Sequence, residues 1–169
     1  CVPWITGGAA VAMAYAVKRH YSTASADDLE WILRPTVALV SGVTGVPFDR
    51  EAGVGYMNAP LRYSIVPACA GVNFWIVAFL SIGFAFLRTE RRAGRAAFGL
   101  FAAALGAYGA TVLANSLRIV LALEIHTRDL HVGGFGADVV HRTLGVLVYV
   151  PALFLVFELA ERAAARRHA

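Results

Sequence analysis

Apolar residues along this chain are gathered into long runs that short polar segments separate. The run from Gly71 to Leu87 is rich in aromatic residues, and two further runs extend over Ala96–Leu123 and Val139–Leu159. Each is close to the ~20 residues that a helix needs to cross a bilayer. The pattern therefore predicts three transmembrane helices.

An earlier apolar run, Ile5–Val17, is too short to span by itself. It is rich in alanine and ends at Lys18-Arg19-His20, and it just reaches spanning length if Val2–Trp4 is included. The polar linker Tyr21–Asp28 follows, and its segment Ser25–Asp28 contains candidate N-caps for the next helix.

The segment Leu29–Val46 is less apolar than a spanning helix. Its apolar residues recur at helical three–four spacing, and Glu30, Arg34 and Ser41 lie off that stripe. This pattern predicts an amphipathic helix that lies in the membrane interface or is half-buried against other helices. The stripe consists of Leu29, Ile32, Leu33, Val37, Val40 and Val43.

The segment Pro47–Ala68 has a different character. A turn-rich polar stretch, Phe48–Gly53, precedes two short stretches, Val54–Met57 and Leu61–Val66, which Asn58-Ala-Pro60 separates. We expect a small hairpin or loop that leads to Cys69. The predicted fold is all-α, a polytopic transmembrane helical bundle in a single domain over residues 1–169, with this short outward-facing hairpin before the cysteine.

Composition and charge agree with a membrane location. Hydrophobic residues make up 59% of the chain, and the net charge of +4 comes mainly from arginine clusters within Arg88–Arg95 and Glu161–Arg167. Positive loops stay on the cytoplasmic side, so the amino end of the Gly71–Leu87 helix is expected to face outward. The clusters lack the interleaved aromatic residues of a nucleic-acid site, and we expect no nucleic-acid partner. We expect instead a multi-pass protein of a prokaryotic inner (cytoplasmic) membrane.

Cys69 stands where a polar, glycine-bearing segment meets the first long apolar run. With Cys1 as the only other cysteine, a disulfide framework is not expected; Cys1 suits a processed end or a lipid-modified residue. A cysteine at a helix amino terminus lies near unbonded N–H groups and the positive end of the helix dipole, which favour its reactive thiolate. The alternative is a small buried hydrophobic residue.

Three further polar residues lie in or at the ends of apolar runs. Asn115 and Arg118 are three residues apart and therefore on one helix face. A charged residue inside a span costs roughly 2.5–3.5 kcal/mol, so it usually faces the bundle interior. The alternative is an arginine that snorkels or pairs with Glu124 or Asp129. His141 opens the last run, one turn before Gly145, and is otherwise an ordinary interfacial histidine.

Cys69, Arg118 and His141 come from three predicted helices and are expected at similar depth on the outer face. A thiolate, a histidine base and a fixed cation are a set suited to acyl transfer. In this reading Cys69 is the nucleophile, His141 the general base and acid, and Arg118 the oxyanion or backbone stabiliser. Asn115 supports Arg118 or donates a hydrogen bond directly.

These motifs resemble the exosortase/archaeosortase family, and most closely its short form, exosortase K. The resemblance rests on Pro-Ala-Cys69-Ala-Gly, Asn115-Ser-Leu-Arg118-Ile and His141-x-x-x-Gly145, in that order. Many members have Ser where this chain has Ala70. The resemblance implies a membrane cysteine protease or transpeptidase, without a cofactor, that acts at the outer membrane face. Its partners would be membrane lipid, a substrate protein with a C-terminal transmembrane sorting signal and an acceptor, lipid or glycan, that is not specified.

Two other functions compete with this reading. A non-catalytic transporter or assembly subunit would use Asn115 and Arg118 to bind an anion. A metalloenzyme would need ligands whose spacing here matches no established zinc pattern such as His-Glu-x-x-His, so no metal is expected. A serine hydrolase lacks its Gly-x-Ser-x-Gly motif. The potential metal ligands are Glu124, His126, Asp129, His131 and His141.

Overall fold

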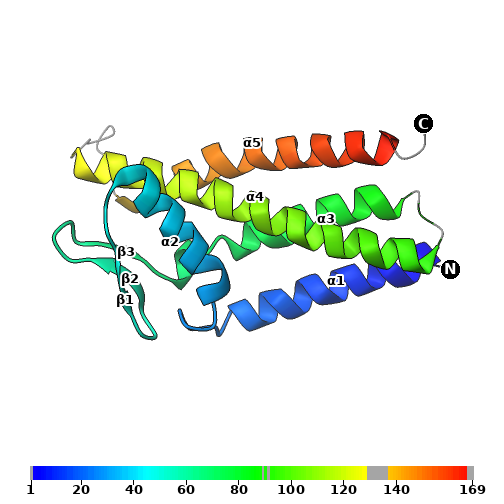
Figure 1. Ribbon diagram of the computed structural model, residues 1–169, viewed down its shortest axis with the longest axis horizontal. Coiled ribbons are helices and arrows are strands. Elements are labelled where there is room, and N and C mark those ends of the chain that lie inside the picture. Colours follow the sequence, from blue (N-terminus) through cyan, green and yellow to red (C-terminus); the bar gives the residue numbers. More distant parts are fainter. Residues whose placement is uncertain (1, 89, 91, 129–136, 167–169) are drawn as a thin grey trace. The chain divides into compact units, whose positions relative to one another are not determined.

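The structure is a computed structural model that describes residues 2–88, 90, 92–128 and 137–166 (Figure 1). It is mainly helical, with a small sheet between the second and third helices. The helices are α1 (Val2–Tyr21), α2 (Glu30–Thr44), the 3₁₀ turn η1 (Pro67–Cys69), α3 (Val72–Leu87), α4 (Ala93–Thr127) and α5 (Ala137–Arg166), and the strands are β1 (Asp49–Glu51), β2 (Gly55–Asn58) and β3 (Tyr63–Ile65).

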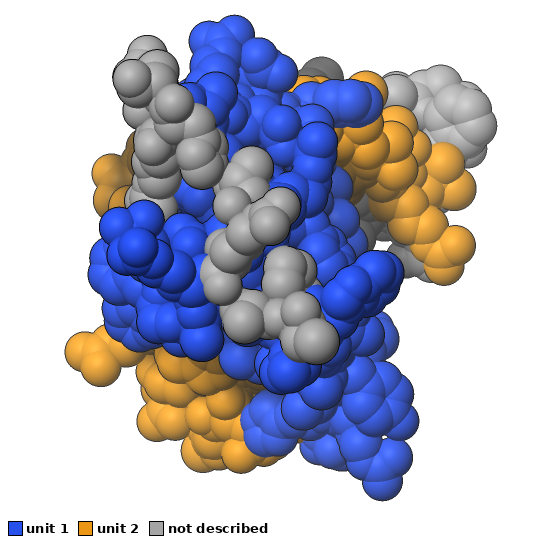
Figure 2. All heavy atoms as spheres, turned by 90° about the vertical axis from the view of Figure 1, so that its right-hand side faces the viewer, with its two compact units in different colours: residues 1–23, 72–111, 152–169 blue, residues 24–71, 112–151 orange. Residues whose placement is uncertain are grey.

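The prediction of a helical membrane protein with three spans is confirmed. Among the described residues, three helical segments are long and apolar enough to cross a membrane: Pro67–Leu87, Ala93–Thr127 and Arg142–Ala165. These contain most of the three predicted runs. The chain divides into two compact units, which Figure 2 colours separately. Unit 1 comprises residues 1–23, 72–111 and 152–169, and unit 2 comprises residues 24–71 and 112–151.

Helix α1 extends beyond the predicted Ile5–Val17 run at both ends. Within unit 1 it runs antiparallel to α3: Lys18 Nζ donates to Asn73 Oδ1 at 2.7 Å, whereas Trp4 lines the same cavity as Leu87. The carboxyl end of α1 therefore meets the amino end of α3. Sequence alone gave no direction for this segment.

Close helix packing in unit 1 depends on small residues of α3 and α4. A Cβ at Gly83 would lie 3.3 Å from Leu100 Cδ2, and one at Gly106 would lie 3.6 Å from Ile82 Cδ1. Trp75 Nε1 donates to the Ala104 carbonyl oxygen at 3.3 Å. The alanine- and glycine-rich composition of α4 thus lets its backbone come close to α3, as is common between helices in lipid.

In unit 2, α2 is the half-buried amphipathic helix that the stripe predicts. Most of the stripe is buried, but Val43 is 72% exposed because the helix ends at Thr44 and Gly45 then turns the chain with φ 70°. The predicted side-chain N-cap is wrong: α2 has Leu29 at its N-cap, and Ser25 bonds to Asp28 in the turn before it. The buried stripe residues are Leu29, Ile32, Leu33, Val37 and Val40.

The sheet has one strand more than the sequence predicted. Strands β2 and β3 match the expected hairpin, and β1 pairs antiparallel with β2 inside the segment that was predicted to be turn-rich. All three β1 residues are exposed, so no apolar alternation marks this strand in the sequence. Backbone pairing and side-chain contacts to α2 stabilise it instead.

Candidate active site around Cys69

Cys69 is the last residue of η1 and is half-buried. Its N–H donates to the Val66 carbonyl oxygen at 2.7 Å, and Ala70 N–H donates to the Pro67 carbonyl oxygen at 3.0 Å. Gly71 then adopts φ 70°, a conformation that side chains with a Cβ rarely adopt, and α3 begins at Val72. The Cys-Ala-Gly sequence therefore forms a tight turn that ends one short helix and precedes the next.

Asn115 connects α4 to this turn. Its side chain is fully buried, and its Nδ2 donates to the Cys69 carbonyl oxygen at 2.5 Å. Its Oδ1 accepts from Tyr149 Oη at 2.7 Å and from Arg118 Nη2 and Nε at 3.1 and 3.3 Å. Asn115 thus accepts from Arg118, as support of that residue requires, and also donates directly to the backbone of Cys69. Its part in a reaction stays a prediction.

Arg118 is 4% exposed and does not snorkel. Its guanidinium carbon lies 5.6 Å from the centre of the Tyr149 ring, in addition to the bonds to Asn115. Glu124, one of the two suggested partners, instead forms an i,i+4 ion pair with Arg128 at 2.9 Å. The other, Asp129, lies outside the described residues. A buried guanidinium is thus held near the backbone of the cysteine turn.

The backbone of His141 lies in α5, but its side chain is outside what the structure describes. Gly145, one turn later, lies beside Arg118: a Cβ there would be 4.0 Å from Arg118 Cδ. Positions 141, 145 and 149 are four residues apart and share one face of α5. That face is the one that contacts α4 at Asn115 and Arg118.

The sequence did not point to Tyr63, an aromatic residue near the site. The Tyr63 ring lies 5.4 Å from the His126 ring and 6.4 Å from the Phe48 ring. His126 Nε2 donates to the Leu61 carbonyl oxygen at 2.8 Å, which attaches the turn before β3 to the end of α4. A tyrosine in a short β segment carries no signal that distinguishes a site residue from a packing residue.

The pKa of the Tyr63 phenol is affected by burial and by the charges of Cys69 and Arg118. Burial raises the pKa of Tyr63 to about 12, and a negative charge on Cys69 acts in the same direction, whereas Arg118 acts in the opposite one. A phenol with this pKa keeps its proton at neutral pH. Tyr63 is therefore a neutral phenol at that pH, and not a base.

Ionic contacts and hydrogen bonds attach the sheet to α2 and to the turn before it. Arg50 Nη2 pairs with Asp27 Oδ1 at 2.7 Å, and Asp27 Oδ2 accepts from Gly53 N–H at 2.9 Å. Tyr56 Oη donates to Glu30 Oε1 at 2.7 Å, and burial, followed by this bond, raises the pKa of Tyr56 to about 12. These contacts fix the hairpin whose last strand leads to Cys69.

The potential metal ligands of the alternative reading are engaged in other contacts or undescribed. Glu124 pairs with Arg128, and His126 bonds to a carbonyl oxygen. Asp129 and His131 lie outside the described residues. Within the part of the chain that the structure describes, no three His, Cys, Asp or Glu side chains are grouped as a metal site.

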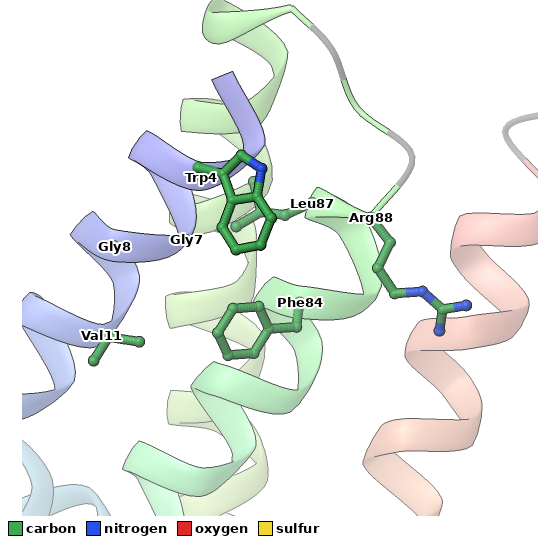
Figure 3. Close-up of a pocket in the computed structure, with 7 residues that line it drawn as sticks. All are labelled: Trp4, Gly7, Gly8, Val11, Phe84, Leu87 and Arg88. Carbon is green, nitrogen blue, oxygen red and sulfur yellow. The ribbon is translucent and has the colours of Figure 1, made fainter. Parts of the chain in front are cut away.

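Unit 1 contains an apolar cavity of about 540 Å³ between α1 and α3. In Figure 3 the rings of Trp4 and Phe84 face the cavity, and the Arg88 guanidinium points away from them. This guanidinium lies 3.5 Å from Glu161 Oε1. The described lining of the cavity is almost entirely apolar, with Arg88 as its charged residue. The lining residues are Trp4, Gly7, Gly8, Val11, Phe84, Leu87 and Arg88.

The fold is that of a polytopic helical membrane protein, because it contains long apolar helices. It has a polar internal site, in which the buried pair Asn115 and Arg118 lies beside the turn at Cys69. Residues 9–158 match the transmembrane exosortase family, so the chain belongs to that family. Membership points to a membrane transpeptidase or protease in general. No curated protein and no solved structure gives a significant match.

Proposed function

We propose that this exosortase is a cysteine transpeptidase that cleaves a C-terminal sorting signal from a substrate protein and transfers the acyl group to an acceptor. The observation that carries the proposal is the hydrogen-bonded chain from the Cys69 carbonyl oxygen through Asn115 to Arg118. It links the backbone of a half-buried thiol to a buried cation within one compact unit. Within the family, we propose the short form, exosortase K, as the form that this chain resembles most.

The reaction would proceed through a thioester. His141 takes the Cys69 thiol proton, and the sulfur attacks the carbonyl carbon of the scissile peptide. Arg118 stabilises the negative oxygen that develops. The C–N bond then breaks, the leaving amine takes the proton from His141, and an acyl group remains on Cys69. An acceptor nucleophile attacks this thioester, and the thiol is restored.

The substrate and the site would meet at the outer face of a prokaryotic cytoplasmic membrane. The arginines between α3 and α4 favour the cytoplasmic side for that loop, which puts the opposite end of α3 outside. A substrate with a short motif, a transmembrane helix and a basic tail would then present its motif at the level of Cys69. The acceptor would be a lipid or a glycan of the cell envelope.

Co-expression with a candidate sorting-signal protein tests this function. Wild-type enzyme is expected to shorten the substrate by the mass of its C-terminal segment, and Cys69→Ala and Arg118→Ala are each expected to abolish this change. A non-catalytic anion-binding subunit predicts a different pattern, in which Cys69→Ala is silent and Arg118→Ala is not. Retention of processing by correctly folded Cys69→Ala would refute the proposal.

A further inference from the structure

Tyr149 of α5 contacts both polar residues of the α4 site. Its hydroxyl donates to Asn115 Oδ1 at 2.7 Å, the shortest of the described bonds to that oxygen. Its ring lies 5.6 Å from the guanidinium carbon of Arg118, a distance typical of a cation–π contact. Tyr149 is thus the residue through which α5 touches the amide and the cation together.

The hydroxyl fixes the orientation of the Asn115 amide. An amide group can turn over and exchange its oxygen with its nitrogen, and only the bonds that it makes select one orientation. The donors Tyr149 and Arg118 both require the oxygen on their side, which leaves Nδ2 for the Cys69 carbonyl oxygen. Loss of the tyrosine hydroxyl would remove the shortest of the described bonds to the amide oxygen.

The ring and the amide together fix the guanidinium. Nε and Nη2 of Arg118 bond to Asn115, which restrains one edge of the plane, and the Tyr149 ring lies within cation–π range of the group. A cation that stabilises an oxyanion is effective when its position is set before the charge develops. Two restraints in different directions provide such an arrangement.

We propose that Tyr149 is a positioning residue, which orients Asn115 and Arg118 for oxyanion stabilisation through its hydroxyl and its ring. This inference rests on the proposed transpeptidase function. It predicts that Tyr149 acts on turnover and through Arg118, because its described contacts are with Asn115 and Arg118.

A purely structural role is the competing explanation, since Tyr149 and Gly145 also set the register of α5 against α4. The contacts Asn115–Tyr149 and Arg118–Gly145 show antiparallel helices, so position 141 lies one turn, ~6 Å, further toward the carboxyl end of α4. An anchor of this kind would affect the stability of the protein. A positioning residue would affect the rate at unchanged stability.

Tyr149→Phe is the informative variant because it removes the hydroxyl and keeps the ring. We expect turnover of a sorting-signal peptide to fall roughly 10-fold with KM unchanged. The melting temperature in detergent should stay close to that of wild type, because Asn115 Oδ1 keeps both of its bonds from Arg118. Tyr149→Leu, which also removes the ring, is expected to fall roughly 100-fold. Tyr15→Phe on the exposed face of α1 is the matched control and is expected to equal wild type.

A double-mutant cycle with Arg118→Lys separates the explanations. If Tyr149 acts through the guanidinium, Tyr149→Phe has little further effect in the Arg118→Lys background under single-turnover conditions. The proposal would be overturned if Tyr149→Phe turned over substrate at the wild-type rate. It would also be overturned if the losses in turnover from Tyr149→Phe and Arg118→Lys multiplied fully in the double mutant, or if the loss in Tyr149→Phe followed a lower melting temperature. Failure of the proposed function is distinct, because Cys69→Ala would then still process substrate.

Discussion

The contacts inside unit 1 differ in kind from the contacts inside unit 2. In unit 1, side chains of α3 meet glycines and alanines of α4, and Trp75 stacks on Phe79 with ring centres 5.4 Å apart. In unit 2, the contacts around Cys69 are polar and directional, with Asn115 at their centre. Helices in lipid associate through close packing and through hydrogen bonds, because lipid provides no hydrophobic driving force between them. Close packing stabilises the helix contacts of unit 1, and specific hydrogen bonds stabilise the contacts around Cys69 in unit 2.

This difference has a consequence for substitutions. Apolar packing against the end of a flexible side chain can adjust by a few tenths of an ångström. A buried amide or guanidinium that loses its partner has no such adjustment and bears the full cost of its burial. Small changes should therefore be tolerated in unit 1 and be costly in unit 2.

The largest expected effect is that of Arg118→Lys. Lysine keeps the charge but lacks the planar fork that bonds to Asn115, so we expect processing to fall on the order of 10³-fold. Arg128→Lys is the matched control, since Arg128 is exposed and its described ion pair is with Glu124, one helical turn away. Processing of the sorting-signal protein by Arg118→Lys at a wild-type rate would contradict a role for the guanidinium.

The second effect concerns Gly55→Ala in the sheet of unit 2. Gly55 has φ 138°, and a Cβ there would collide with the Ile65 carbonyl oxygen of β3. We expect a loss of ~3 kcal/mol in the free energy of unfolding, measured by denaturant titration in detergent. Gly42→Ala in α2, where no atom lies within 4 Å of the new Cβ, is the control and should be neutral or slightly stabilising.

Gly83→Ala in unit 1 completes this comparison. The new Cβ would lie 3.3 Å from Leu100 Cδ2, which is the end of a flexible side chain. We expect a change below ~1 kcal/mol in the same titration. Equal losses for Gly55→Ala and Gly83→Ala would contradict the contrast between the units.

A third effect compares one polar contact from each unit. Asn115→Ala removes the partner of the Cys69 carbonyl oxygen and of Tyr149, and we expect a loss of ~2–3 kcal/mol in the free energy of unfolding. Trp75→Phe removes the single bond from Nε1 to the Ala104 carbonyl oxygen and should cost ~1 kcal/mol. A larger loss for Trp75→Phe than for Asn115→Ala would reverse the comparison.

The last effect, which is confined to alkaline pH, is the dependence of stability on the protonation of Tyr56. The pKa of Tyr56 is raised from 10.0 to about 12 in the folded protein, so its proton is held more tightly there than in the unfolded chain. Its contribution to stability is complete below pH 10 and is lost as the pH rises from 10 to 12. In Tyr56→Phe the unfolding midpoint should change less between pH 10 and 12 than it does in wild type. An equal change in both proteins would show that Tyr56 does not contribute.

The sequence was sufficient for the features that depend on apolar periodicity. The three spans are visible as long apolar runs, and the spacing of Asn115 and Arg118 put both on one helix face, where the structure has them bonded to each other. Cys69 was expected before the first span, and it lies three residues ahead of α3. The catalytic roles of Cys69, Arg118 and His141 stay predictions.

Features that depend on tertiary contact were missed. Strand β1 has no apolar alternation and exists because it pairs with β2. Tyr149 lies in an apolar run, where an aromatic residue looks like a lipid-facing or core residue, and its partner Asn115 is 34 residues away. The contact of His126 with Leu61, across 65 residues, is equally invisible to local patterns.

The most direct test of the account is a search for the acyl group on Cys69. Purified enzyme would be incubated with a sorting-signal peptide in the absence of acceptor, and its intact mass would be measured before and after hydroxylamine. We predict an adduct with the mass of the amino-terminal peptide fragment, mapped to Cys69, removed by hydroxylamine and absent from Cys69→Ala. Cleaved peptide without such an adduct, at equal rates in wild type and Cys69→Ala, would contradict the account.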